Sequence, residues 1–182
     1  MGISGQNSFE GWYFKHQKGD DMVACIPGLA ESGAFIQLIS QEGTKQFEIS
    51  NLTVHNGSIQ ADRCRFSQQG CQIELPGVSG EILYGSLTPL CSDIMGPFRF
   101  FPMECRHGVL SMAHTLQGSV TIDGQLHRFD GGLGYAEKVT MPPMNTFQIT
   151  GYKRRSIWNH YGNKLGNNPA FRLWMETGTR MC

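Results

Sequence analysis

Short apolar or alternating segments, separated by glycine-rich turns, follow one another along most of the chain. Because residues 34–39 are apolar on both faces, they are typical of a central strand, whereas only residues 171–176 could begin a helix. The turn spacing is typical of antiparallel barrels and sandwiches, so we predict an all-β fold. The expected strands, roughly ten to twelve, include residues 9–15, 22–26, 34–39, 46–49, 53–55, 78–87, 109–117 and 145–152.

Two dipeptides predict tight hairpins. Asn56-Gly57 and Asp123-Gly124 each lie between β-prone runs, and such pairs prefer two-residue turns in which both residues adopt positive φ. A third hairpin is expected around residues 67–70. The predicted pairings are 52–55 with 58–61, 119–122 with 125–129, and 63–66 with 71–75.

Two further local patterns predict where one strand ends and which side chains share a face in another. Pro27-Gly28 should end the strand that begins at Met22, because proline interrupts a hydrogen-bonded ladder. In the strand at 109–117, strict alternation would place one histidine among three large apolar residues on a single face. Such a histidine is more often a hydrogen-bonded core residue than a ligand. The residues of that face are Leu110, Met112, His114 and Leu116.

The composition of the chain indicates a globular protein and argues against several kinds of partner and location. The 182 residues fit one domain, and the 40% hydrophobic content with 16% charged residues indicates a globular chain. The formal net charge of zero argues against a nucleic-acid partner, which normally requires a basic surplus. The N-terminus lacks a signal-peptide pattern and no run of about 18 apolar residues exists, so we expect no membrane span and a cytoplasmic protein. The six cysteines, none in a Cys-x-x-Cys motif, are interpreted as reduced.

No common catalytic template matches, and no histidine or cysteine spacing indicates a metal site. We therefore expect neither a metal nor a cofactor. What remains is a set of carboxylates and histidines within apolar strands, and the densest example is the segment FEGWYFK at residues 9–15. As a strand it places Glu10 beside Trp12 and Phe14, which can shift a carboxyl pKa. The competing interpretation is a core strand with a charge at each end.

Several motifs, in order, resemble those of the tocopherol cyclase-like proteins over about residues 9–138. They are FEGWYFK at 9–15, AFIQ at 34–37, IMGPF at 94–98, MECRHG at 103–108, SMAH at 111–114 and GGLGYAEK at 131–138. The resemblance implies a lipocalin-like antiparallel fold around an apolar cavity. It also implies closure of a chromanol ring on a prenylated quinol, an apolar small molecule.

That reaction sets physical demands on the site. An acid with a raised pKa must protonate an alkene, aromatic rings can stabilise the resulting cation, and a base must take the phenolic proton. Glu10 or Glu104 suits the acid, and His107 or His114 suits the base. If, instead, carboxylates such as Glu10 and Glu137 pair with Lys15 and Lys138, they only lock strand ends. The candidate catalytic residues are Glu10, Glu104, His107, His114 and Glu137, and the candidate substrate-binding residues are Trp12, Tyr13, Phe14, Phe35, Met112 and Tyr135.

The resemblance ends near Lys138, where residues 139–143 replace the continuation usual in the family. We therefore divide the chain into a tocopherol cyclase-like β domain, 1–138, and a divergent segment, 139–182. An incomplete barrel would leave open edges, which favour pairing with a second copy. Two alternatives to the cyclase stay open: a non-catalytic lipocalin-like binder of an apolar molecule, and an inactive truncated family member.

Overall fold

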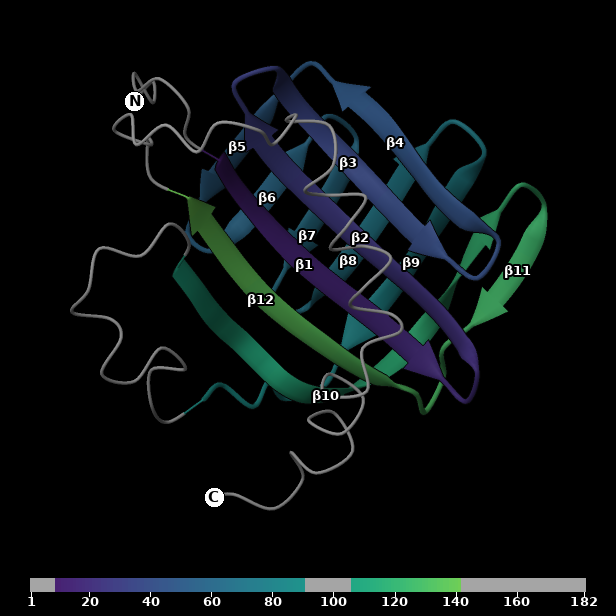
Figure 1. The fold of residues 1–182 in the computed structure, drawn as a ribbon. Helices are drawn as coiled ribbons and strands as arrows, with labels where there is room; N and C mark the ends of the chain where they lie inside the picture. The colour runs from purple at the N-terminus through teal and green to yellow at the C-terminus, as the bar shows by residue number, and fades with distance from the viewer. Residues whose placement is uncertain (1–8, 91–105, 142–182) are drawn as a thin grey trace, which may run out of the picture. The chain divides into compact units, whose positions relative to one another are not determined.

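A computed structural model describes residues 9–90 and 106–141, and these form an antiparallel sheet of 12 strands without a helix. The chain divides into two compact units, Met1–Met144 and Asn145–Cys182, and every described residue belongs to the first. The strands are β1 (Phe9–Lys18), β2 (Asp21–Ala30), β3 (Gly33–Ser40), β4 (Gly43–Ile49), β5 (Leu52–His55), β6 (Ser58–Ala61), β7 (Cys64–Ser67), β8 (Gly70–Leu75), β9 (Val78–Tyr84), β10 (Arg106–Ile122), β11 (Gln125–Arg128) and β12 (Leu133–Met141) (Figure 1).

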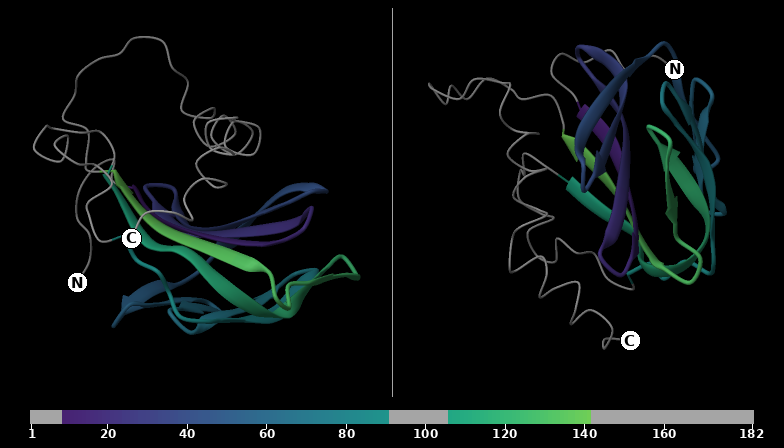
Figure 2. Two further views of the ribbon diagram at one scale, coloured as in Figure 1. Left: turned by 90° about the horizontal axis from the view of Figure 1, so that it is seen from below. Right: turned by 90° about the vertical axis from the view of Figure 1, so that its right-hand side faces the viewer.

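The long strand β10 joins two layers of this sheet. Its first part pairs with β12, and its second part pairs with β9 and β11. Strands β1 to β4 and β12 form one layer and β5 to β9 the other, as Figure 2 shows. The strand order runs from β4 through β1, β12 and β10 to β5, so the described sheet is not closed into a barrel. The predicted all-β, incomplete lipocalin-like fold is confirmed, whereas pairing of a second copy along its edges stays a prediction.

Both dipeptide hairpins are confirmed. Asn56 and Gly57 have φ values of 48° and 74°, and Leu52–His55 pairs with Ser58–Ala61 as expected. Asp123 and Gly124 have φ values of 48° and 86°, and join β10 to β11. These turns form because asparagine, aspartate and glycine tolerate the left-handed conformation that the hairpin requires.

Two predicted strand limits are wrong. β2 continues through Pro27 to Ala30, because Pro27 and Gly28 keep their partners Ile36 and Phe35 in β3. The proline interrupts the other ladder instead, where the β1–β2 pairing passes from Gly11–Gly28 to Phe14–Cys25. β9 ends at Tyr84 rather than at residue 87. The expected elements at 145–152 and 171–176 lie outside the described residues.

The alternation expected along β10 is also wrong. Register shifts between Val109 and Ser111, and between Ser111 and His114, show that the strand bulges twice. A bulge inserts an extra residue and changes which face the following side chains share. Leu110 is consequently 40% exposed, while His114 and Leu116 are buried.

A hydrophobic core fills the space between the layers. The first layer contributes Trp12 and Phe14 and the second contributes Phe66 and Ile82, with the Phe14 and Phe66 rings stacked 5.2 Å apart. Packed side chains thus occupy the region where the family resemblance implies an apolar cavity. Cys25, Cys64 and Cys71 are buried and free, as a reduced chain requires. Among the described residues, no helix has the length and apolar character needed to cross a membrane.

Candidate functional site

Four of the residues singled out from the sequence lie together on the face of the first layer that points away from this core. Strand pairing places Tyr13 opposite Glu137, so the odd-numbered residues of β1 and β12 share that face. The Tyr135 hydroxyl donates a hydrogen bond to Glu137 Oε2 over 2.8 Å, and the Tyr13 ring meets the Tyr135 ring edge-on at 6.2 Å. We call the region of Tyr13, His107, Tyr135 and Glu137 the tyrosine face.

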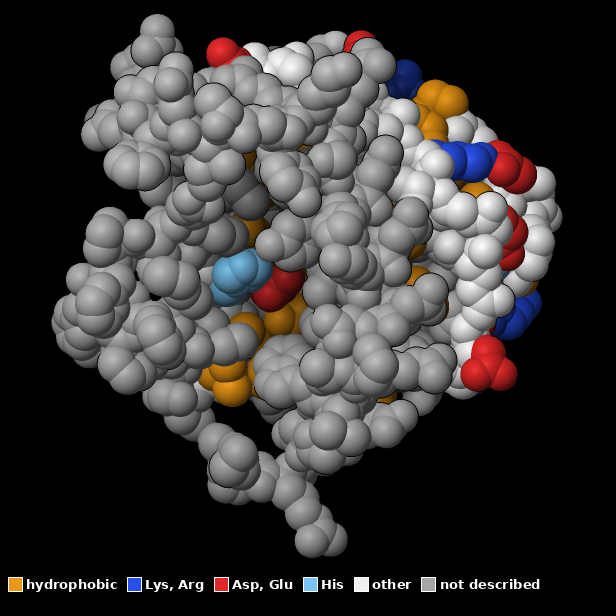
Figure 3. All heavy atoms as spheres, viewed as in Figure 1, with side chains coloured by type: hydrophobic (Ala, Val, Ile, Leu, Met, Phe, Trp, Pro, Cys, Tyr) orange, Lys and Arg blue, Asp and Glu red, His pale blue; other side chains and the backbone are white. Residues whose placement is uncertain are grey.

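The charged groups of the tyrosine face come from neighbouring strands. His107 Nδ1 lies 3.7 Å from Glu137 Oε2, which is an electrostatic contact rather than a hydrogen bond. The side chains of His107 and Glu137 are 39% and 18% exposed, so both remain within reach of a ligand. On the face viewed in Figure 3, a histidine and an acidic side chain lie side by side with hydrophobic side chains around them.

Burial keeps both tyrosines of this face protonated. Desolvation raises the pKa of Tyr13, and the nearby Glu137 charge raises it further. The pKa of Tyr135 is raised for the same two reasons, and the hydrogen bond to Glu137 adds to the effect. Both phenols therefore stay protonated well above neutral pH, and the Tyr135 hydroxyl donates to the Glu137 carboxylate.

Glu10 lies on the opposite, core-side face and has a countercharge. Lys138 Nζ lies 2.5 Å from Glu10 Oε1 and 5.2 Å from the centroid of the Trp12 ring. This is the strand-locking ion pair that was the competing interpretation of Glu10. Trp12 and Phe14 pack into the core, while Glu104 lies outside the described residues.

The remaining aromatic candidate, Phe35, belongs to the same face as Tyr13. Its ring packs over Gly28, and it stacks with the Phe9 ring at a centroid distance of 6.3 Å. Gly28 pairs with Gly11, over which Phe9 packs. Because Gly11 and Gly28 have no side chains, the rings of Phe9 and Phe35 can lie flat against the sheet beside the tyrosine face.

His114 belongs to a separate, buried polar cluster, and Met112 lies half-buried within the second register shift of β10, between Ser111 and His114. The His114 Nδ1 atom is 2.9 Å from Ser111 Oγ, whereas its Nε2 atom has no hydrogen-bond partner among the described residues. The Tyr84 ring lies 4.5 Å from the His114 ring. Burial lowers the pKa of His114 to about 4, so the imidazole is neutral.

Sequence reasoning missed the partner that completes this cluster. His16 Nδ1 is 3.2 Å from the Val23 carbonyl oxygen, which can only accept, so Nδ1 carries the proton. His16 Nε2 must then accept the 2.7 Å hydrogen bond from the Tyr84 hydroxyl. Tyr84 also lines a cleft of about 440 Å³ together with Thr115 and Asp130. No local signal in the sequence pairs residues 16 and 84, because they lie in different layers.

Tyr84→Phe is expected to lower the free energy of unfolding by about 1–3 kcal/mol. It removes the strong hydroxyl donor to the buried Nε2 of His16 and leaves only the weak thiol donor of Cys71, 3.7 Å away. Urea unfolding at pH 7 measures the change. Tyr13→Phe is a comparison in which that histidine keeps its partner. An unfolding midpoint of Tyr84→Phe equal to that of the unmodified protein would contradict the assigned hydrogen bond.

Comparisons with known proteins show a shared fold. No protein-family model matches the chain, and no curated protein matches it either. Among solved structures, CghA with Sch210972 superposes with a TM-score of 0.51 at 13% sequence identity, covering 75% of this chain and 46% of that chain. A second structure of CghA gives a TM-score of 0.51 at 13% identity, with coverages of 76% and 47%. The chain therefore spans about half the length of these structures and shares their β architecture.

Proposed function

We propose that this protein binds a hydroxyl-bearing apolar small molecule on the tyrosine face and acts on it as a tocopherol cyclase-like enzyme. The observation that carries the proposal is the Glu137 carboxylate, held by Tyr135 at 2.8 Å and approached by His107 at 3.7 Å. A largely buried carboxylate with spare acceptor capacity is suited to a phenolic hydroxyl. The structural similarity to CghA, which has been solved with Sch210972, supports a small-molecule ligand.

The proposed chemistry is an intramolecular ring closure on a prenylated quinol. An acid gives a proton to the alkene, the phenol oxygen forms a bond to the tertiary cation, and Glu137 takes the phenolic proton. Substrate and product are isomers, because one proton enters and one leaves. His107, which the sequence suggested as a base, lies beside Glu137 and is instead proposed as a proton donor, while Glu104 remains the other proposed acid. Tyr13, Tyr135 and Phe35 offer aromatic surface to the cation.

The alternative is a non-catalytic binder that uses the same face. The filled core between the layers leaves the tyrosine face, rather than the interior, as the place for an apolar ligand in either case. The ion pair of Glu10 with Lys138 also weighs against Glu10 as the acid, because that carboxylate already has a countercharge. Trp12 and Phe14, as core residues, are not proposed to contact the ligand, and an inactive family member would show neither binding nor turnover.

Glu137→Gln is expected to lower the rate of cyclisation at least 100-fold, because general base catalysis contributes about 10²–10⁴. The assay incubates the protein with a prenylated quinol and separates the isomeric product by chromatography before mass spectrometry. Glu10→Gln is the matched control, since the same change falls on the other face and should leave the rate within a few fold.

Two results would reverse these assignments. Full activity of Glu137→Gln would remove Glu137 from the mechanism. Saturable binding of the quinol by the unmodified protein without any product would replace the enzyme by the non-catalytic binder.

A further inference from the structure

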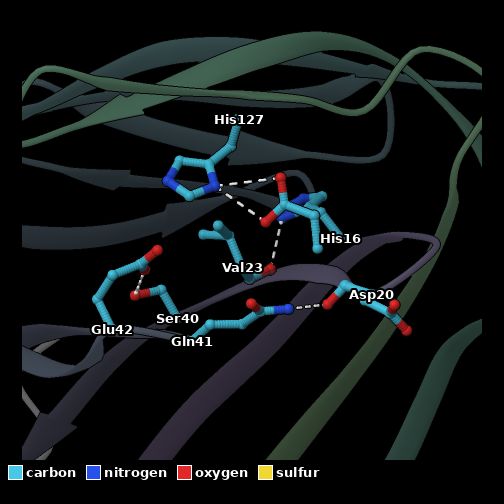
Figure 4. A network of polar contacts seen from close by, with 8 residues as sticks. His16, Asp20, Val23, Ser40, Gln41, Glu42 and His127 are labelled. Carbon is cyan, nitrogen blue, oxygen red and sulfur yellow. Dashed lines mark hydrogen bonds and ion pairs between the residues drawn. The ribbon is translucent and has the colours of Figure 1, made fainter.

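One buried polar side chain makes no hydrogen bond in the part of the chain that the structure describes. Five polar residues are buried there, and four of them make at least one side-chain hydrogen bond. These four are His16, Ser111, His114 and His127. Figure 4 shows two of the contacts, one from His16 to the Val23 carbonyl oxygen and one from His127 to a carboxylate. The fifth residue, Gln37 in β3, is 6% exposed, and its carboxamide has no partner among the described residues.

Gln37 lies on the same side of the first layer as the tyrosine face. The continuous register between β2 and β3 places Gln37 opposite Ile26. The pairing of β1 with β2 keeps one register on both sides of its interruption, so Ile26 lies opposite Tyr13. Tyr13 pairs in turn with Glu137. Because directly opposite residues of neighbouring strands share a face, the four residues form one row across the sheet, with Glu137 and Gln37 at its ends.

This row has a polar group at each end and an apolar middle. Neighbouring strands lie about 4.8 Å apart, so three strand steps separate the backbones of Glu137 and Gln37 by about 14 Å. The Tyr13 ring and the Ile26 side chain, which is 3% exposed, lie between them. Both end residues have long side chains that can incline toward the middle of the row. The distance between the end groups therefore suits an aromatic ring with an oxygen on each of two opposite sides.

The chemistry of the carboxamide explains why its burial points to a ligand. The group has two N–H donors and one carbonyl acceptor. Burying it without partners costs free energy, whereas a leucine of similar size in the same place would carry no such cost. A ligand that supplies the missing hydrogen bonds offsets that cost when it binds. Gln46, which pairs with Gln37 from β4, is exposed, so water can satisfy its carboxamide.

We infer that Gln37 is the second hydrogen-bonding residue of the ligand site on the tyrosine face, and that it selects ligands with two oxygens. The inference rests on the proposed function, in which the Glu137 carboxylate accepts the phenolic hydroxyl that reacts. The Gln37 carboxamide binds the hydroxyl on the opposite side of the quinol ring, which keeps its proton throughout the ring closure. Tyr13 and Ile26 contact the ring between these two groups. A monophenol loses one of the two polar contacts and binds more weakly.

The test is calorimetric titration of the full chain, without oxygen, using two ligands that cannot cyclise. One is a 2-alkylquinol with a saturated branched chain, and the other is the 2-alkylphenol that keeps only the hydroxyl next to the chain. The unmodified protein should bind the quinol about 10-fold more tightly than the phenol, the effect of one further hydrogen bond. Gln37→Leu should lose this preference, because leucine offers no partner to the second hydroxyl. Gln46→Leu is the matched control, since the same change in the exposed neighbour should leave the preference intact.

Urea unfolding without ligand separates binding from a structural role. Gln37→Leu should unfold at the same or a higher urea concentration than the unmodified protein, because it removes an unpaired buried polar group. A lower midpoint would show that Gln37 serves the fold and would overturn the inference. Equal affinity of the unmodified protein for the two ligands would also overturn it, while leaving the proposed function in place. Absence of binding of either ligand would remove the inference and the proposed function together.

Discussion

Acidification from pH 7 to pH 5 is expected to lower the free energy of unfolding by roughly 4 kcal/mol, through two buried histidines. Burial lowers the pKa of His16 from 6.5 to about 3 and that of His114 from 6.5 to about 4. His16 is fully buried, and His114 is only 4% exposed. Neither ring can gain a proton at pH 5 without leaving its site or bringing a charge into the core.

The direction follows from which state binds more protons. Below pH 6.5 the unfolded chain protonates both imidazoles while the folded chain does not, so stability falls as the pH falls. The contribution is complete above pH 6.5 and is lost progressively down to the folded-state pKa values of about 4 and about 3. Each histidine contributes about 1.4 kcal/mol per pH unit within that window.

Urea unfolding between pH 7 and pH 5 measures this dependence. His16→Gln and His114→Gln should each remove about half of the slope, whatever they do to stability at pH 7. His55→Gln is the comparison, because it removes an imidazole from the surface rather than from the core. An unfolding free energy that stays constant over this range would show that the two imidazoles accept protons in the folded state.

Gly80→Ala is expected to destabilise the protein by about 2–3 kcal/mol, because it forces an added methyl group against the backbone of the neighbouring strand. A Cβ at this position would lie 2.3 Å from the Ser119 carbonyl oxygen and 2.7 Å from the Val120 Cα atom. Gly80 pairs directly with Val120, in the part of β10 that belongs to the second layer. The added methyl group would therefore force β9 and β10 apart at this pair. Backbone in a paired strand cannot rotate away as a side chain can.

Gly108→Ala supplies the comparison in β10 itself. A Cβ there meets nothing within 4 Å, so its effect should stay within about 0.5 kcal/mol. Both variants are measured by urea unfolding at pH 7. Equal midpoints for Gly80→Ala and Gly108→Ala would mean that β9 and β10 are not in close contact at this point.

The local parts of the fold were predictable, and the long-range parts were not. Asn56-Gly57 determines its hairpin because the backbone preference of two adjacent residues selects the turn. The strand end predicted at Pro27 is wrong because the missing N–H affects only one of the two ladders of β2. The pairing with β1 is interrupted while the pairing with β3 continues, and the sequence does not indicate which neighbour keeps the strand extended. The bulges around Ser111 lie where Thr88, more than twenty residues away in the sequence, contacts β10 with its backbone N–H donating to the Ser111 hydroxyl over 3.1 Å.

In the candidate site, too, the residue types were predictable from the sequence and their arrangement in space was not. Sequence reasoning collected Glu10, Tyr13, Tyr135 and Glu137, but only the pairing of β1 with β12 decides which of them share a face. Because Tyr13 pairs with Glu137, Glu10 falls on the other side, next to Lys138. The tyrosine face is therefore a consequence of register between strands more than a hundred residues apart, which period-two alternation alone does not contain.

The position of strand β12 in the sequence affects how the protein folds during translation. It is the only strand of the described sheet that links β1 to β10, and its partner Phe9 precedes it by more than a hundred residues. The hairpins of β2 to β9 can form as they emerge, but β1 must wait with one edge bare until Leu133–Met141 has been synthesised. Chains that stall before that point would expose an aromatic strand to other nascent polypeptides, so translation rate and chaperone supply should govern the yield of native protein.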